Sequence, residues 1–172
     1  NGFVTAEESV ESAWAQVENQ YQRRADLIPN LVNTVQGAAD FEQETLQSVI
    51  EARSRATSIT LQADDLNDPA KIQQFQAAQE QLSGALSRLL VSVERYPELK
   101  ANANFRDLQA QLEGTENRIA TERKRFNDTA RQYNTDIRKF PGSLIASITG
   151  FDRKAYFEAN EGAEQPPLVD FE

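Results

Sequence analysis

The chain of 172 residues is long enough for one domain with a substantial core, and its 39% apolar and 26% charged residues suit long amphipathic helices. It contains no Cys and no His, which excludes disulfides, thiolate nucleophiles, zinc–sulfur sites and histidine general bases. The net charge of −9 disfavours binding to the phosphate backbone of a nucleic acid.

The first predicted helix covers about residues 6–36 and carries a heptad stripe of apolar and aromatic side chains. Thr5 and Glu8 have the spacing of a capping box at its start. Arg24 occupies a slot in which a strict heptad places an apolar residue. Pro29 lies inside the pattern and predicts a kink rather than an end. The stripe consists of Val10, Trp14, Val17, Tyr21, Ile28, Leu31 and Val35.

A second helix is predicted after a break at Gly37, with Asp40 as its N-cap and the polar residues 63–68 after its end. The sequence leaves open whether Gly37 only weakens one long rod that joins the first two helices. The second stripe consists of Leu46, Val49, Arg53 and Ala56.

The third predicted helix has the most regular stripe. Asp68 and Pro69 fit the N-cap and the first helical position, and Pro97 ends the pattern. Gln79 is the one slot that is neither apolar nor aromatic. The stripe consists of Ile72, Phe75, Gln79, Leu82, Leu86, Leu89, Val93 and Tyr96.

The fourth predicted helix runs from about Ala101 to Lys139, and Pro141 follows it. After an apolar first third, aromatic and polar slots alternate along its stripe. Apolar and aromatic residues within 144–157 predict one or two further helical turns that fold back on the bundle. Residues 158–172 are acidic and contain no Lys or Arg, and they are expected to be disordered.

Short connections between long helices favour antiparallel neighbours. We therefore predict an all-α fold, in which residues 1–157 form an antiparallel four-helix bundle with a first helix kinked near Pro29 and a short helical C-terminal extension. No run approaches about 18 consecutive apolar residues, so no segment is expected to span a bilayer. Because the chain begins at Asn1 rather than Met, we expect an N-terminal signal or anchor to have been removed.

Residue types limit the chemistry that this bundle can support. The usual di-iron carboxylate site of helical bundles needs His, and no glycine-rich phosphate loop or Gly-x-Ser-x-Gly turn is present. The acidic pairs Glu42/Glu44 and Asp64/Asp65 are interpreted as solvated helix ends. We therefore expect no enzymatic activity, no catalytic or metal-binding residue and no cofactor.

Charged residues in core slots are the more informative feature. Arg24, Arg53, Glu122 and Asp136 occupy such slots, and Glu116 and Arg123 lie one position off the stripe. If the first and fourth helices lie side by side with their centres level, Arg24 comes close to Glu116, with Glu122 about one turn beyond. A buried guanidinium needs a carboxylate partner. The favoured interpretation is an ion pair that sets helix register, and the alternative is a polar site for a ligand or partner.

The stretch 118–131 has five basic and two acidic residues. A solvated outer face is the favoured interpretation, and contact with anionic lipid or nucleic acid is the alternative. Aromatic side chains on the stripes, such as Trp14, Phe75 and Tyr133, are interpreted as core.

Several motifs resemble those of the LemA family over about residues 1–157. The run RRADLIPNLV at 23–32 is the most specific of them. Phe126 departs from the family pattern, which has Tyr before Asn127, so a catalytic tyrosine is not expected there. Further matching segments are NGFV at 1–4, YPELKA at 96–101, TE at 115–116, FN at 126–127, YN at 133–134, FP at 140–141 and GF at 150–151.

The resemblance implies a long-helix bundle in a bacterial protein, held at the cell membrane by a single N-terminal transmembrane or lipoprotein anchor, with the domain extracytoplasmic. It implies no particular activity. Together with the core-slot charges, its motifs indicate seven candidate polar-core or interaction residues, namely Arg24, Asp26, Arg53, Glu116, Arg123, Asn127 and Asn134.

Three functional hypotheses follow from the sequence. The first is a membrane-anchored, non-enzymatic interaction or scaffold domain with a protein partner and no nucleic acid. The second is a small-ligand receptor or enzyme that uses Arg24, Glu116 and Arg123. The third is a peripheral binder of anionic lipid. A closed ion pair at Arg24 favours the first, whereas an open cleft with convergent polar groups favours the second.

Overall fold

The computed structural model describes residues 2–38, 40–139 and 142–158, which are mostly helical and contain no strand. The expected acidic tail, except for Glu158, lies outside the described residues. The elements in chain order are α1 (Gly2–Gln36), α2 (Gln43–Ser58), the 3₁₀ helix η1 (Ala63–Asn67), α3 (Pro69–Val93), α4 (Pro97–Lys100), α5 (Ala103–Arg138) and α6 (Gly142–Thr149).

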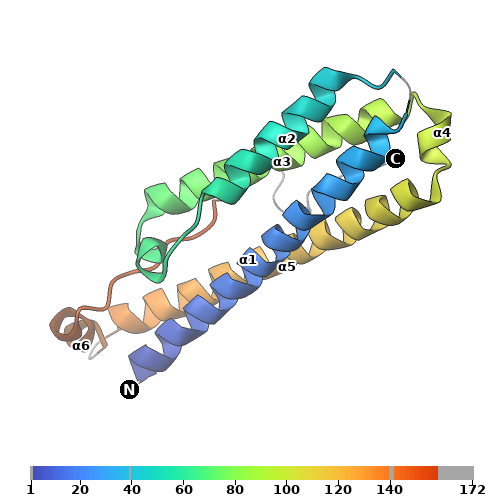
Figure 1. The fold of residues 1–172 in the computed structure, drawn as a ribbon. Coiled ribbons are helices and arrows are strands. Elements are labelled where there is room, and N and C mark those ends of the chain that lie inside the picture. The colour runs from blue at the N-terminus through green and yellow to red at the C-terminus, as the bar shows by residue number, and fades with distance from the viewer. Residues whose placement is uncertain (1, 39, 140–141, 159–172) are drawn as a thin grey trace.

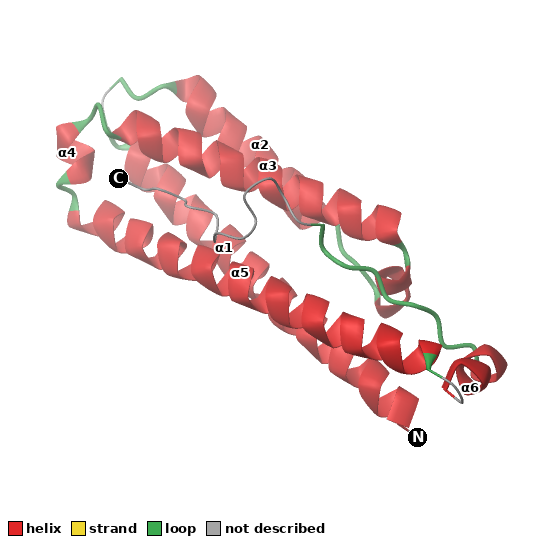
Figure 2. Ribbon diagram, turned by 180° about the vertical axis from the view of Figure 1, so that it is seen from behind, coloured by secondary structure: helices red, strands yellow, loops and turns green. Residues whose placement is uncertain are grey.

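The four long helices alternate in direction, which confirms the predicted antiparallel bundle (Figure 1). α1 packs mainly against α5 over most of their length, and α2 packs mainly against α3. α4 closes one end of the bundle, whereas α6 and the start of α1 lie at the other end (Figures 1 and 2). No helix within the described ranges is both long enough and apolar enough to cross a bilayer.

Several predicted helix boundaries are confirmed. The carboxylate of Asp68 accepts a hydrogen bond from the Ala70 amide at 3.0 Å, and Pro69 begins α3. α1 continues through Pro29 to Gln36 without a break. α1 and α2 are separate helices, which settles the alternative of one continuous rod.

Two predicted N-caps are wrong. α1 already begins at Gly2, so Thr5 and Glu8 lie inside the helix and form no capping box. α2 begins at Gln43 rather than next to Asp40, which has a φ of 65°. This left-handed conformation reverses the chain between α1 and α2, and the Asp40 carbonyl accepts a hydrogen bond from the Tyr96 hydroxyl at 3.0 Å.

α3 ends at Val93, three residues before the end of its predicted stripe. The amides of Glu94, Arg95 and Tyr96 bond three residues back rather than four, which tightens the chain before Pro97. The ring of Tyr96 still packs on Phe41, with centroids 4.8 Å apart, and so contributes to the core despite lying outside the helix.

The prediction of helical turns over 144–157 is half wrong. α6 provides the turns at Gly142–Thr149, but residues 151–158 form an extended segment that passes between α3 and α5 (Figure 2). Gly150, with a φ of +78°, joins the two parts. We call residues 151–158 the return segment.

The core divides into two clusters along the bundle axis. The cluster toward α4 includes Ile28, Leu82 and Leu112, and the cluster toward α6 includes Tyr21, Phe75 and Ile119. Each of these three pairs spans a gap on one helix, and each gap contains a buried polar residue, namely Arg24, Gln79 and Glu116. The core is therefore interrupted by a polar layer at mid-height.

Candidate functional site: the polar layer and the return segment

Arg24 forms the centre of the polar layer. It comes from α1, its side chain is 1% exposed, and its Nη1 lies 2.7 Å from Oε1 of Glu116 on α5. The predicted pairing of Arg24 with Glu116 is thus confirmed. Glu122, the alternative partner, instead accepts a hydrogen bond from Arg125 at 3.1 Å.

α3 supplies the remaining acceptors for the guanidinium. Nη1 of Arg24 also donates to the hydroxyl of Ser83, and Nη2 donates to the backbone and side-chain oxygens of Gln79 at 2.9 and 2.8 Å. The guanidinium carbon lies 5.2 Å from the centroid of the Tyr21 ring, a distance typical of a cation–π contact. All four N–H bonds of the two terminal nitrogens are therefore used within the chain.

The layer joins three helices at one height. An uncompensated guanidinium would be costly to bury, and the carboxylate of Glu116 together with the oxygens of Gln79 offsets that cost. Sliding α1, α3 or α5 by one turn would separate these groups. The geometry therefore fixes the relative register of the helices, which is the first interpretation drawn from the sequence.

Arg53 acts next to this layer. Its Nε donates to the backbone carbonyl of Ala25 at 2.8 Å. In an uninterrupted helix this carbonyl would accept the amide hydrogen of residue 29, but Pro29 has none. α2 is thereby attached to α1 at the point where α1 lacks a hydrogen bond.

The return segment is held by three side-chain amides. Asn134 exchanges two hydrogen bonds with the backbone of Lys154, at 2.8 and 2.7 Å. Asn127 does the same with Phe157 at 3.4 and 2.9 Å, and Gln76 with Glu158 at 2.9 and 3.0 Å. Each amide both donates and accepts, as the backbone of a neighbouring strand would.

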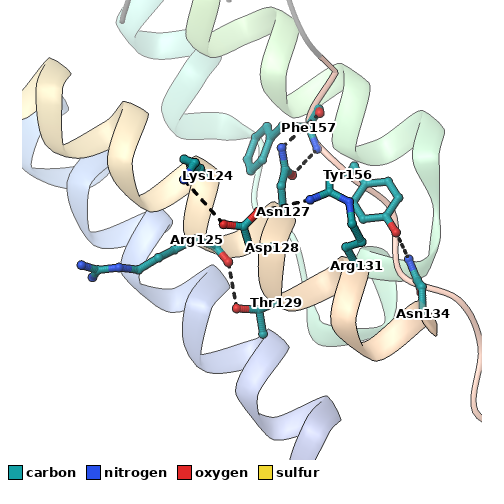
Figure 3. A network of polar contacts seen from close by, with 9 residues as sticks. All are labelled: Lys124, Arg125, Asn127, Asp128, Thr129, Arg131, Asn134, Tyr156 and Phe157. Atoms are coloured by element: carbon teal, nitrogen blue, oxygen red, sulfur yellow. Dashed lines mark hydrogen bonds and ion pairs between the residues drawn. The ribbon is translucent and has the colours of Figure 1, made fainter. Parts of the chain in front are cut away.

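Figure 3 shows how two of these amides project from α5 toward the return segment. Asn134 also donates to the hydroxyl of Tyr156 at 2.7 Å. On the same helix, Lys124 and Arg131 pair with Asp128 at 3.9 and 3.2 Å, and the guanidinium carbon of Arg131 lies 5.6 Å from the centroid of the Tyr156 ring. The basic stretch predicted on α5 is therefore partly neutralised by its own carboxylates.

Lys154 is a buried cation that the sequence analysis missed. Its Nζ lies 3.1 Å from Oε2 of Glu7 and 5.4 Å from the centroid of the Tyr133 ring. The Tyr133 hydroxyl lies 3.3 Å from the same carboxylate oxygen. Burial raises the pKa of Tyr133 above its usual range, and the negative charge of Glu7 raises it further.

Phe157 anchors the end of the return segment in an aromatic cluster. Its ring lies 5.7 Å from Trp14 and 5.6 Å from Phe126, measured between centroids. The guanidinium carbon of Arg123 lies 4.8 Å from the Phe157 centroid. The absence of a hydroxyl at Phe126 suits this fully apolar contact.

The seven candidate residues thus fall into distinct places. Arg24 and Glu116 meet in the polar layer, and Arg53 lies beside it at Ala25. Asn127, Asn134 and Arg123 contact the return segment instead. Asp26 is exposed and accepts a hydrogen bond from Gln22.

Other functional side chains were missed by sequence reasoning. Ser83 and Gln76 carry no signal beyond being polar residues in an amphipathic helix. Gln79 was visible as the one polar slot of its stripe. Glu7 lies near the start of α1, where nothing marks it as the partner of Lys154, a residue 147 positions away.

A surface groove lies between α2 and α3. Charged residues of both helices line it, and its lining does not include Arg24, Glu116 or Arg123. No group of three or more acidic residues in the described ranges is arranged to hold a metal ion. The lining consists of Ser48, Glu51, Ala52, Arg55, Ala77, Glu80, Gln81, Gly84, Ala85 and Arg88.

Comparison with known proteins matches residues 13–171 to the LemA family. The magnetosome protein MamQ 2 of Paramagnetospirillum magneticum is 28% identical over 185 aligned residues, which cover 98% of this chain and 68% of the relative. The magnetosome protein MamQ of Magnetospirillum gryphiswaldense is 29% identical with the same coverage. Protein LemA of Metamycoplasma hominis is 22% identical over 161 residues, covering 94% of this chain and 69% of the relative.

Proposed function

This chain belongs to the LemA family, and from that premise we propose that it is a non-enzymatic helical interaction domain, anchored at a bacterial membrane by its N-terminal end. Its partner in this proposal is another protein that binds the outer faces of the bundle. The domain lies on the extracytoplasmic side.

The observation that carries the proposal is the closed state of the polar layer. Arg24 is 1% exposed, and its terminal nitrogens are satisfied by Glu116, Gln79 and Ser83. A ligand could reach this guanidinium only by displacing partners from α3 and α5. The charged residues most typical of a binding site are thus used to hold the helices in register.

The return segment supports the same conclusion. It occupies the space between α3 and α5, and the amides of Gln76, Asn127 and Asn134 are engaged by its backbone. The chain therefore fills its own interior, and the helix surfaces remain for contact with a partner. Within this proposal the partner binds at the groove between α2 and α3, which is lined by charges of both signs.

The anchoring part of the proposal follows from the resemblance to LemA proteins, and the structure shows which end of the bundle such an anchor would hold. α1 begins at the end where α6 also lies (Figure 1). A membrane segment joined to the start of α1 would place α6 next to the bilayer and α4 about one helix length away from it. The α2–α3 groove would then face sideways, where a neighbouring membrane protein can reach it.

Site-specific photocrosslinking of the full-length protein in its native membrane tests the proposal. A photoreactive amino acid is placed at Arg55 in the α2–α3 groove, at Gln81 on the facing helix, and at Glu113 on the exposed face of α5 as a control. We expect the same protein adduct from the two groove positions and none from the control. Alkaline carbonate extraction of the same membranes tests the anchor, since an anchored chain stays in the membrane pellet.

The proposal fails if the groove positions yield no common adduct, or if the adduct is formed equally at Glu113. A receptor or enzyme built on Arg24, Glu116 and Arg123 predicts something different. A small ligand would then raise the melting temperature of the wild-type domain, and Glu116→Gln would abolish that rise.

A further inference from the structure

α6 exposes an unusual amount of apolar surface for its length. Leu144, Ile145 and Ile148 are 55%, 43% and 76% exposed, whereas Ala146 is buried against the bundle. The helix sequence GSLIASIT contains no charged residue. An eight-residue helix that turns three large aliphatic side chains to solvent has one face packed and the other without a partner among the residues that the structure describes.

The exposed face of α6 is part of a larger apolar end of the molecule. The rings of Phe3 on α1 and Phe151, just after α6, pack with centroids 5.5 Å apart. Val4, the next residue of α1, is itself 45% exposed. Both views place α6 at the end of the bundle where α1 begins, and α6 packs against α5 (Figures 1 and 2). The other exposed large apolar residues among those described, Ile50 and Val91, belong to α2 and α3.

We propose that α6 is an interfacial helix, which inserts Leu144, Ile145 and Ile148 into the lipid–water interface of the membrane. The proposal rests on the anchoring proposed above, because the anchor brings this end of the bundle to the bilayer. Its occupant is a lipid surface. Burial of aliphatic side chains in the acyl region of a membrane needs no complementary protein pocket.

The residues that flank α6 fit the same surface. Lys139 precedes the helix and Arg153 follows it, and both are exposed. Cations next to an inserted apolar patch meet the phosphates of lipid headgroups. The acidic Asp152 lies beside Arg153, so we expect insertion to depend more on the apolar side chains than on anionic lipid.

A second copy of the chain is a less suitable occupant. A stable protein interface buries about 800 Å² on each partner. The exposed parts of three side chains on an eight-residue helix supply only a fraction of that area. Insertion of α6 into lipid does not need a high intrinsic affinity. A tether at the start of α1 holds α6 next to the membrane at a high effective concentration, so that even weak binding leaves most of the helices inserted.

The absence of cysteine from the chain allows an uncomplicated test with a single fluorescent label. An environment-sensitive dye is attached to Ile148→Cys or, as a matched control, to Val91→Cys, an exposed apolar position on α3. The full chain carries an N-terminal hexahistidine tag that tethers it to phosphatidylcholine vesicles containing a nickel-chelating lipid. A second vesicle set also contains phosphatidylglycerol.

We expect tethering to shift the emission of the dye at position 148 to the blue, with a several-fold rise in intensity and quenching by spin-labelled lipid. The dye at position 91 should not respond. The substitutions Leu144→Ser and Ile145→Ser should abolish the response at position 148 without changing the helical circular dichroism spectrum.

The proposal is overturned if the dye at position 148 stays in an aqueous environment on tethered chains, or if both positions respond equally. It is also overturned if the blue shift appears without vesicles and grows with protein concentration, which would assign the patch to a second copy. The artificial tether makes this test independent of the native anchor, and the anchor is judged by carbonate extraction.

Discussion

The Nε of Arg53 donates a hydrogen bond to the backbone carbonyl oxygen of Ala25 at 2.8 Å, and so replaces the hydrogen bond that Pro29 cannot make. A proline in the middle of a long helix leaves the carbonyl four residues earlier without its donor. Here the donor comes from the neighbouring helix α2. The position of Pro29 on α1 thus sets which carbonyl of α1 is free to accept the hydrogen bond from Arg53 of α2.

Arg53→Ala should lower the free energy of unfolding by about 1–3 kcal/mol, because the Ala25 carbonyl loses its partner in a largely buried place. Pro29→Ala restores an amide hydrogen that can bond to the same carbonyl. In the Pro29→Ala background we therefore expect a smaller loss from Arg53→Ala. Urea unfolding of the four proteins of this double-mutant cycle measures the coupling.

The control for this cycle is Arg55→Ala, an exposed position on the same helix, which should change stability by less than about 0.5 kcal/mol. If the losses from Arg53→Ala are equal in the two backgrounds, Arg53 contributes through packing of its aliphatic stem and not through the Ala25 carbonyl.

Asn134→Leu should release the return segment. The substitution preserves side-chain volume approximately but leaves both backbone groups of Lys154 without their partners, at a cost of about 2–4 kcal/mol. Trypsin cleaves after Arg153 and Lys154, and we expect cleavage there to become much faster. The amide of Lys154 should also lose its protection against hydrogen exchange, while amides in the middle of α1 keep theirs.

Asn117→Leu is the matched control, because Asn117 lies on the exposed face of the same helix. It should leave both the tryptic pattern and the exchange of Lys154 unchanged. Equal cleavage in the two variants would show that the aromatic cluster around Phe157 holds the segment without help from the amide.

The heptad pattern was sufficient to predict the bundle, its directions and the pairing of Arg24 with Glu116. These features follow from periodicity, because a polar residue in an apolar slot must find its partner at the same height on a neighbouring helix. Gln79 was visible for the same reason. The aliphatic residues in the core slots could be placed without knowing any tertiary contact.

The return segment could not be predicted in the same way. Its apolar residues suggested helical turns, but Asn134, Asn127 and Gln76 provide its hydrogen bonds from 20, 30 and 82 residues away. Such partners override local preference. Asn127 and Asn134 were candidate polar residues, but nothing in the sequence paired them with this segment. Similarly, the residue type of Asp40 suits an N-cap, but in the fold this residue lies where the chain changes direction and has a positive φ.

Stability should fall at alkaline pH through Tyr133 and Tyr21. Burial raises the pKa of both hydroxyls, so the unfolded chain releases their protons near pH 10 while the folded chain retains them. Below pH 10 the two protonated hydroxyls make their full contribution to the free energy of unfolding. Above pH 10 the free energy of unfolding falls by about 1.4 kcal/mol per pH unit for each tyrosine.

Tyr133→Phe removes one of the two titrating hydroxyls. The free energy of unfolding of this variant should therefore fall less steeply above pH 10 than that of the wild type. Urea unfolding between about pH 8 and pH 11 measures the slope for the two proteins. Glu7 and Lys154 both contact Tyr133, so a small loss from the missing hydroxyl is expected at neutral pH as well. An unchanged alkaline slope in the variant would contradict the assignment.

The last prediction concerns the Arg24–Glu116 pair, which joins α1 to α5. The two side chains are 1% and 5% exposed, so Arg24→Ala leaves a carboxylate buried without its counter-charge. We expect a loss of about 3–5 kcal/mol, because breaking a buried pair costs more than replacing both members. Arg24→Leu combined with Glu116→Leu should recover much of it, although Gln79 still loses its donor.

The exposed pair Arg95–Glu42, at 3.2 Å, provides the matched control within the same chain. Its double-mutant cycle should give a coupling of about 0–1 kcal/mol that weakens with salt, whereas the Arg24–Glu116 coupling should exceed it and hardly change. Urea unfolding at low and high ionic strength measures both cycles. If the single variants at Arg24 and Glu116 hardly change the free energy of unfolding and their effects add in the double variant, the two residues do not form a buried ion pair that sets helix register. A large loss from Arg24→Ala without coupling to Glu116 would instead make the oxygens of Gln79 the main partners of the guanidinium.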